Sequence, residues 1–246
     1  MVKLAIIGGT GLTSLQGAEI TRREEVQTPY GAPSDALVYA SLHGVPVVFL
    51  ARHGHRHQIP PHRVNYRANI WALRQGGAER IFAAAAVGGI HSELVSGRIA
   101  IPQQIVDYTW SRASTFFEDD LEHVVHVDFT EPYCPELRGR MIRCARAAGL
   151  DAWERGTYGV TQGPRLETAA EIERMARDGC DMVGMTAMPE AGLARELELP
   201  YATCAMVVNA AAGRGEGPIT MKDIEANLKG TVQKLRTLLQ HLVAEL

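Results

Sequence analysis

Strand-like and helix-like segments alternate along this chain of 246 residues, and this alternation restricts its fold more than any other feature. Apolar runs typical of strands occupy residues 2–7, 36–42, 45–51, 80–87, 99–105, 156–161, 182–185 and 201–208. Segments with helical spacing occupy residues 66–75, 135–148, 168–178, 189–197 and 221–246. Such alternation predicts a largely parallel sheet with helices on both faces.

The connection at His43-Gly44 predicts a hairpin, so some strand pairs should be antiparallel and the sheet mixed. No linker, repeat or shift in composition interrupts the chain, and its hydrophobic content of 46% is enough for a full core. We therefore predict one α/β domain over residues 1–246, built as a mixed sheet surrounded by helices.

Composition excludes several classes of partner. A net charge of −3 shows no excess of basic residues that would bind nucleic acid. No apolar run reaches the length of a membrane span. The first strand begins at the N-terminus, so we expect no leader peptide. The four cysteines form no C-x-x-C pair, which argues against a zinc ribbon or a disulfide framework. These features predict a cytoplasmic enzyme or small-molecule binder, with no membrane or nucleic-acid partner.

The first strand runs directly into the glycine loop Gly8–Gly11, where backbone N–H groups can approach an anion and Thr10 adds a hydroxyl. A P-loop would need a lysine, and none occurs between Lys3 and Lys222. A dinucleotide loop would need a third glycine where Thr13-Ser14 stands. The loop therefore favours free phosphate, although a simple tight turn fits the same residues.

A second polar group, Arg52-His53-Gly54-His55-Arg56-His57, follows the strand over residues 45–51. The planar guanidinium of Arg52 can donate paired hydrogen bonds to phosphate, and His53 can add a second donor. The alternating histidines also fit a metal site. The H-x-H-x-D-H pattern of binuclear hydrolases is broken, however, because His57 and Gln58 stand where Asp and His would be needed. Phosphate is the favoured ligand, and a solvated surface loop is the remaining alternative.

Polar side chains also follow three later strands. Glu167 precedes a helix and is either a site residue or a capping charge. Thr186 can be a helix N-cap, a phosphate donor or both, and the preceding Met185 either packs in the core or contacts a ligand. Asn209 ends an apolar strand and needs a hydrogen-bonding partner, from a ligand or from a neighbouring loop.

Six segments, in this order, resemble the trimeric purine nucleoside phosphorylase/methylthioadenosine phosphorylase family. They are residues 8–12 (GGTGL), 51–54 (ARHG), 64–73 (VNYRANIWAL), 130–135 (TEPYCP), 163–165 (GPR) and 184–190 (GMTAMPE). The resemblance implies a mixed sheet ringed by helices, phosphorolysis of a purine nucleoside, and a homotrimer. It also implies inorganic phosphate as co-substrate, with no metal or organic cofactor.

The resemblance assigns roles residue by residue. The phosphate-binding positions are Thr10, Arg52, His53 and Thr186, with the backbone of Ala85 and Ala86. The catalytic contacts to the base are Glu167 and Asn209. The other substrate contacts are Leu166, Met185, Ala210, Ala211, Met221 and Ile224, with His126 reaching the 5′ side of the neighbouring subunit's ligand.

Residue differences among members of this family predict which base the chain releases from its nucleoside. Adenine-cleaving members carry Ser at Glu167 and Asp at Asn209 and Ala211, whereas members that cleave 6-oxopurines carry Glu and Asn at the first two positions. A carboxylate accepts the N1–H of a 6-oxopurine and repels the N1 lone pair of adenine. Relatives that cleave inosine place a histidine where Met221 stands, so the 5′ pocket is apolar here and suits a methylthio group.

The chain is therefore predicted to convert 5′-methylthioinosine and phosphate to hypoxanthine and 5-methylthioribose 1-phosphate. Overall similarity favours methylthioadenosine phosphorylase as an alternative, but Glu167 opposes it. Inosine/guanosine phosphorylase is a second alternative, which Met221 opposes. A non-catalytic nucleoside-binding module would bind ligand without phosphate-dependent turnover.

Overall fold

Eleven strands form one sheet in the residues that the computed structural model describes, 2–9, 17–119 and 121–246. The strands are β1 (Leu4–Gly8), β2 (Glu19–Glu24), β3 (Leu37–Leu42), β4 (Val45–Ala51), β5 (Ile81–Gly89), β6 (Ile99–Ala100), β7 (Gln104–Asp107), β8 (Ala152–Trp153), β9 (Thr157–Val160), β10 (Met182–Gly184) and β11 (Tyr201–Ala210). The helices are α1 (Tyr66–Gln75), α2 (Pro135–Ala147), α3 (Ala169–Arg177), α4 (Ala187–Glu196) and α5 (Met221–Ala244), with a 3₁₀ turn at Pro61–Arg63. The predicted α/β class is confirmed.

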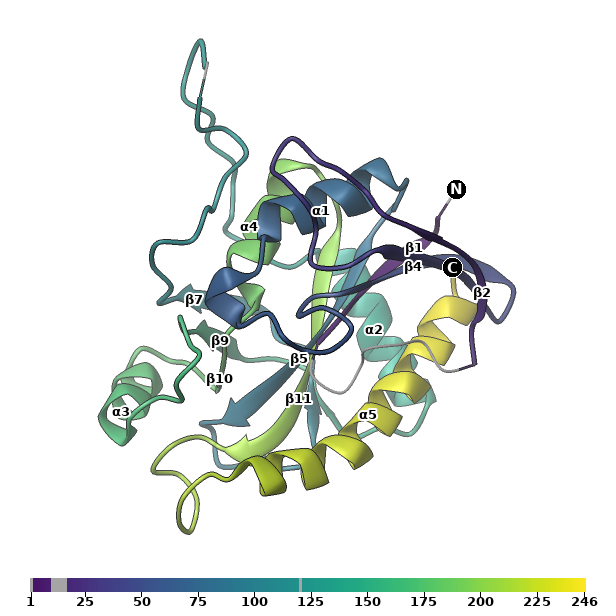
Figure 1. Cartoon of the computed structure of the whole chain (residues 1–246). Coiled ribbons are helices and arrows are strands. Elements are labelled where there is room, and N and C mark those ends of the chain that lie inside the picture. Colours follow the sequence, from purple (N-terminus) through teal and green to yellow (C-terminus); the bar gives the residue numbers. More distant parts are fainter. Residues whose placement is uncertain (1, 10–16, 120) are drawn as a thin grey trace.

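Strand β5 lies at the centre of the sheet (Figure 1). It pairs in parallel with β1 and with β11, and its last residues pair antiparallel with β10. Beyond β1 the sheet continues through the parallel strand β4 to the antiparallel strands β3 and β2. Beyond β10 it continues through β9 to β7, both in parallel pairs. The sheet is mixed, as predicted.

Alternate residues of the strands pack against different layers of helices. In β1, Leu4 and Ile6 belong to a core shared with α2 and α5, whereas Ala5 and Ile7 belong to a core shared with α1 and α4. All four side chains are fully buried, which explains why this strand is a continuous apolar run. Figure 1 shows α1 and α4 on one side of the sheet, and α2 and α5 on the other.

The sheet differs from the prediction in the division of one segment and in two strands that were not predicted, β2 and β8. The segment 99–105 was expected to be one strand, but it forms the two short strands β6 and β7. Pro102 lies between them, and because proline has no backbone N–H it interrupts the ladder. Strand β2 was not predicted, because all six of its residues are exposed and no apolar pattern marks it. Strand β8 has only two residues.

Local signals set the other boundaries. His43 and Gly44 both have positive φ, 51° and 83°, as the two-residue hairpin between β3 and β4 requires. Thr168 caps α3 in a capping box with Glu171. Within α4, Met188 is extended, so the regular helix begins at the next residue, a proline, as predicted.

The segment over residues 108–134, between β7 and α2, contains no helix or strand among its described residues. Figure 1 shows it as the teal segment that extends away from the sheet, and we call it the arm. Several apolar side chains of the arm are exposed, including Val124 at 70%. Within the described ranges, no helix is long and apolar enough to cross a membrane.

Candidate active site

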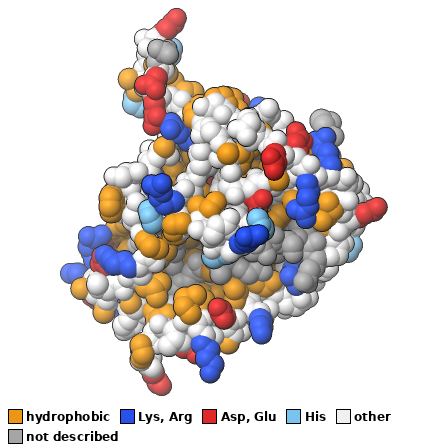
Figure 2. Space-filling view, viewed as in Figure 1, with side chains coloured by type: hydrophobic (Ala, Val, Ile, Leu, Met, Phe, Trp, Pro, Cys, Tyr) orange, Lys and Arg blue, Asp and Glu red, His pale blue; other side chains and the backbone are white. Residues whose placement is uncertain are grey.

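A cavity of about 530 Å³ opens where β4, β5, β10 and β11 end. This is the position at which α/β sheets bind ligands, outside the carboxyl ends of their strands. Figure 2 shows hydrophobic side chains gathered around a hollow on this face. The predicted site residues that line the cavity are Arg52, His53, Ala85, Ala86, Leu166, Glu167, Met185, Thr186, Asn209, Ala211, Met221 and Ile224.

Two of the predicted residues that the structure describes are not among the lining residues. Ala210 lies on β11 beside Asn209 but does not border the cavity. His126 is exposed on the arm, also outside the cavity lining of this single chain. Thr10 lies outside the described residues.

Arg52 is almost fully buried, and its guanidinium is held by the protein. It donates from Nε to Glu190 Oε2 and from Nη2 to Glu190 Oε1, both at 2.7 Å, and from Nη1 to the carbonyl of Ala84 at 2.8 Å. Burial alone would lower the pKa of Arg52, but the Glu190 carboxylate outweighs it and raises that pKa. Three of the five N–H groups are thus bound, and the other two can meet an anion in the cavity.

Glu190 was not predicted as a site residue. It is fully buried, and it also accepts a hydrogen bond from the Tyr201 hydroxyl at 2.8 Å. A signal was present in the sequence, because Glu190 is the one charged residue in the stretch 183–194. A charge in such an apolar stretch requires a buried partner, but nothing in the local pattern identifies Arg52, which is 138 positions away.

The glycine loop begins close to the same guanidinium. A Cβ atom at Gly9 would lie 2.7 Å from the Ala84 carbonyl oxygen and 3.1 Å from Arg52 Nη1. Glycine is therefore required here for the close approach of the end of β1 to Arg52.

His53 is neutral near pH 7. Its Nδ1 lies 2.8 Å from the Ile59 carbonyl oxygen, which can only accept, so Nδ1 carries the proton and Nε2 is an acceptor. Burial, followed by the positive charge of Arg52, lowers the pKa of His53 to about 4. An anion bound beside Nε2 must therefore bring its own proton, and HPO₄²⁻ has one.

The alternating histidines do not share one face. Residues 52–57 form turns rather than an extended chain, so the His53 and His57 rings lie 4.7 Å apart while His55 Nδ1 lies 3.3 Å from Asp35 Oδ2. Among the described residues, no three His, Cys, Asp or Glu side chains are grouped to hold a metal ion.

His53 makes the stability of the protein sensitive to acid. The unfolded chain binds a proton at this histidine near pH 6.5, whereas the folded protein does so only near pH 4. Neutral His53 therefore makes its full contribution to the free energy of unfolding above pH 6.5. Up to about 3 kcal/mol of that free energy is lost as the pH falls towards 4. Urea unfolding between pH 7 and 4.5 should show a shallower pH dependence for His53→Asn. The exposed control His43→Asn should keep the wild-type slope, and equal slopes for both variants would contradict this assignment.

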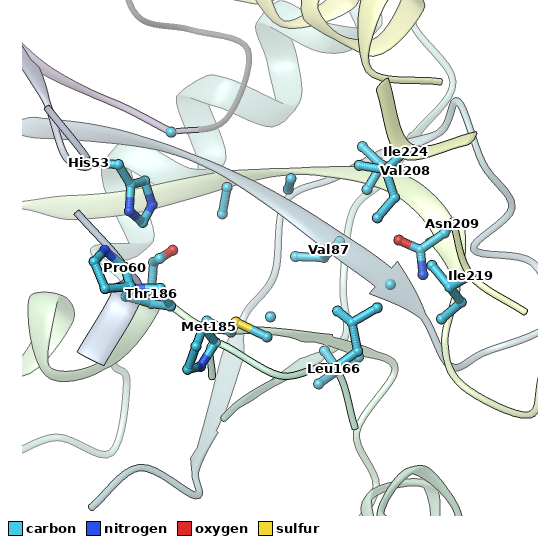
Figure 3. A pocket seen from close by; sticks show the side chains of 18 of the residues that line it. His53, Pro60, Val87, Leu166, Met185, Thr186, Val208, Asn209, Ile219 and Ile224 are labelled. Atoms are coloured by element: carbon cyan, nitrogen blue, oxygen red, sulfur yellow. The ribbon is translucent and has the colours of Figure 1, made fainter. Parts of the chain in front are cut away.

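Thr186 occupies the N-cap position of α4, as expected, but its side chain makes no capping hydrogen bond, so the hydroxyl is not used by the helix terminus. Its side chain is 8% exposed and lies on the same side of the cavity as His53 (Figure 3). Met185 borders the cavity instead of lying in one of the main cores. The carboxyl end of β10 thus supplies a hydroxyl and an apolar wall.

Asn209 reaches the cavity through a β-bulge. In the β5–β11 pair, Val207 faces Val87 and Asn209 faces Gly88, so Val208 is an extra residue. Consecutive strand residues normally point to opposite faces, but here Val208 and Asn209 both line the cavity. Asn209 Nδ2 donates to the Ala210 carbonyl at 2.7 Å, and Figure 3 shows its side chain at the opposite end from His53 and Thr186.

Glu167 is half-buried and is not the cap of α3, because Thr168 performs that role. Its Oε1 accepts a hydrogen bond of 2.5 Å from the Thr161 hydroxyl, a contact that the sequence did not predict. This bond orients the carboxylate and leaves Oε2 available to a donor in the cavity.

The mouth of the cavity is apolar. Met221 is 64% exposed and Leu166 44% exposed, while Ile219 and Ile224 lie deeper. Ile219 was not predicted, and neither were His57, Gln58 and residues 59–61, which line the side nearest His53. Of these residues, only His57 belongs to a distinctive motif, the histidine-rich segment over residues 52–57.

Comparison with known proteins identifies the family. The model of the phosphorylase superfamily matches residues 3–244. A probable S-methyl-5′-thioinosine phosphorylase of Pseudomonas syringae is 54% identical and covers 99% of both chains. A 6-oxopurine nucleoside phosphorylase of Pyrococcus furiosus is 49% identical over 91% of this chain and 85% of its own.

Among solved structures, methylthioadenosine phosphorylase from Schistosoma mansoni in complex with adenine superimposes with a TM-score of 0.95. It is 33% identical and is matched over 99% of this chain and 91% of its own. The resemblance drawn from the sequence motifs is confirmed, and the chain belongs to the phosphorylase superfamily.

Proposed function

We propose that this protein catalyses the phosphorolysis of 5′-methylthioinosine, giving hypoxanthine and 5-methylthioribose 1-phosphate. The observation that carries the proposal is the distribution of polar side chains along the cavity. His53 and Thr186 lie at one end and Asn209 at the other, and Arg52, next to His53 in the chain, and Glu167 also line the cavity. The relative from Pseudomonas syringae carries a name with the same substrate.

At the anion end, phosphate is bound by the free N–H groups of Arg52 and by the Thr186 hydroxyl, and the phosphate O–H donates a hydrogen bond to His53 Nε2. The backbone of Ala85 and Ala86 lies alongside, and Thr10 completes the set. One phosphate oxygen forms a bond to C1′ as the C1′–N9 bond breaks. The bonding electrons pass to the base, and the phosphate charge stabilises the oxocarbenium-like ribosyl centre.

At the base end, Glu167 Oε2 accepts the N1–H of hypoxanthine. Asn209 spans N7 and O6 and stabilises the negative charge that grows on the departing base, which takes up a proton from solvent at N7. For this contact its Nδ2 must leave the Ala210 carbonyl, or donate its second proton. Ala211 has no carboxylate to accept a hydrogen bond from the amino group of adenine.

At the 5′ end, Met221, Ile219 and Ile224 present apolar surface to a methylthio group. A second candidate substrate is inosine, which is a 6-oxopurine nucleoside, the class for which the relative from Pyrococcus furiosus is named. The same residues provide no hydrogen-bond partner for its 5′-hydroxyl, so inosine should be the poorer substrate.

We also propose that the protein is a cytoplasmic homotrimer of single-domain subunits, which needs phosphate and nucleoside but no metal or organic cofactor. The exposed apolar side chains of the arm favour a subunit interface there, and they include Leu121, Val124, Val125 and Val127. His126 lies among them, which supports its assignment to a neighbouring subunit's 5′ pocket.

Release of hypoxanthine from 5′-methylthioinosine should require inorganic phosphate, with 5-methylthioribose 1-phosphate formed in equal amount. The reason is that the cavity offers an anion site, formed by Arg52, His53 and Thr186, to the attacking co-substrate. Product analysis with and without phosphate checks this. Equal rates in phosphate-free buffer would make the protein a hydrolase, and tight binding without turnover would make it a binding module.

A further inference from the structure

Arg112, at the base of the arm, binds two chain segments that border the cavity. Its Nη1 donates to the carbonyls of Met185 at 2.9 Å and Met188 at 2.6 Å. Its Nη2 donates to the carbonyls of Thr161 at 3.1 Å and Gln162 at 2.8 Å. Its Nε donates to Gln162 Oε1 at 3.0 Å. One side chain therefore joins the end of β9 to the β10–α4 connection.

Each of these segments carries a proposed site residue. The segment 185–188 includes Met185 and Thr186, which line the cavity. In the other segment, the residue whose carbonyl Arg112 binds, Thr161, also holds the Glu167 carboxylate through its hydroxyl. The base end and the phosphate end of the cavity are thus fixed to the same guanidinium.

A third part of the wall is linked more weakly. Arg112 Nη1 lies 3.3 Å from the Tyr66 hydroxyl, and that hydroxyl donates to the Pro61 carbonyl at 3.0 Å. Pro61 lines the cavity on the side of His53. The guanidinium also lies 5.4 Å from the centre of the Tyr66 ring.

These contacts require an arginine. All five N–H groups have acceptors within the protein, four of the acceptors are backbone carbonyls, and no described carboxylate lies within ion-pair distance. A lysine has three donors at one point and cannot span two segments. Because the contacts are to main chain, Arg112 sets backbone positions rather than the state of one side chain.

We propose that Arg112 is a positioning residue, which holds Thr186 and Glu167 at the separation that the nucleoside and phosphate require. The proposal rests on the proposed function. Arg112 does not line the cavity, so its effect on the reaction passes through the segments that it binds. Displacements of about 1 Å between catalytic groups typically cost about 10²-fold in rate.

The test compares Arg112→Lys with Arg138→Lys in the full-length assembly. Arg138 is a matched control, because it is also half-buried and also donates to backbone carbonyls, those of Pro102 and Glu154, but it does not line the cavity. With 5′-methylthioinosine and phosphate, Arg112→Lys should lose about 10²-fold in kcat/KM, mainly in kcat, while Arg138→Lys stays within about threefold. The two variants should melt at similar temperatures.

Two further readouts separate positioning from general loss of structure. Ethylguanidinium, but not ethylammonium, should restore part of the kcat of Arg112→Ala. Hydrogen exchange should accelerate in residues 161–167 and 184–190 of Arg112→Lys but not of Arg138→Lys, and this measurement does not depend on catalysis. If Arg112→Lys does not fold, Gln162→Met removes the acceptor of Arg112 Nε, which also accepts from the Trp110 backbone N–H, and should lower kcat about three- to tenfold.

A folded Arg112→Lys protein with kcat/KM within threefold of wild type, or unchanged exchange in both segments, would overturn the proposal. An inactive wild-type protein whose Arg112→Lys variant still shows accelerated exchange would instead refute the proposed function and leave the structural role of Arg112 supported.

Discussion

Glu190→Ala should lower the free energy of unfolding by about 3–5 kcal/mol, because it leaves the guanidinium of Arg52 buried without its carboxylate. Arg52→Ala should be similarly destabilising, since it leaves Glu190 charged and buried. Arg52→Ala should also raise the phosphate concentration needed for half-maximal rate by about 30- to 150-fold, the equivalent of about 2–3 kcal/mol for a lost bidentate charged contact. Urea unfolding and phosphate titration of the rate measure the two effects.

The double variant Arg52→Met/Glu190→Met separates stability from binding. It removes both buried charges, so most of the stability should return, while phosphate binding should not. The surface pair Lys3–Glu79 supplies a control, because Lys3→Met should change stability by about 1 kcal/mol or less. If the double variant is as unstable as the sum of the single variants, the two charges do not act as one pair.

Methylthioinosine should be cleaved at least about 10³-fold better than methylthioadenosine in kcat/KM. Glu167 meets an N1–H in the first and a lone pair in the second, and a buried polar group left unpaired rejects the mismatched base strongly. Inosine should be intermediate, because the apolar surface of Met221 and Ile224 offers its 5′-hydroxyl nothing. Parallel measurement of kcat/KM for the three nucleosides at saturating phosphate checks this order.

Substitutions at the base end of the cavity should shift the selectivity of this protein from hypoxanthine towards adenine. Glu167→Ser combined with Asn209→Asp and Ala211→Asp should restore some activity towards methylthioadenosine, since it supplies an acceptor for N6 and a proton source for N7. Glu173→Ser is the matched control, an exposed carboxylate on α3 that lies outside the cavity lining and should leave selectivity unchanged. Equal release of adenine and hypoxanthine by the unmodified protein would refute the roles given to Glu167 and Asn209, but not the phosphorolysis.

Much of the candidate site was predictable because its residues stand at the ends of strands. Polar residues after apolar runs, such as His53 after β4 and Thr186 after β10, are exceptions to a buried pattern, and parallel strands bring their ends together. The partners of these residues were not predictable. Glu190 and Arg52 are separated by 138 positions, and the contact of Thr161 with Glu167 depends on how the connection between β9 and α3 folds back on itself.

Some limits of prediction lie in local structure. The bulge at Val208 decides that Asn209 points into the cavity, and no turn residue or change of polarity marks it in the sequence. The histidines of residues 53–57 alternate as in an extended chain, yet a tight turn brings His53 and His57 together and separates His55.

The sequence by itself determined the α/β class, the helix boundaries to within about two residues and the residue types that chemistry at the cavity needs, because apolar periodicity and capping residues act over a few positions. Tertiary structure alone decided how those residues are held. The Arg52–Glu190 pair and the contacts of Arg112 with the carbonyls of two segments join positions tens of residues apart. They form because a buried charge or carbonyl must find a partner wherever the packed sheet and helices place one.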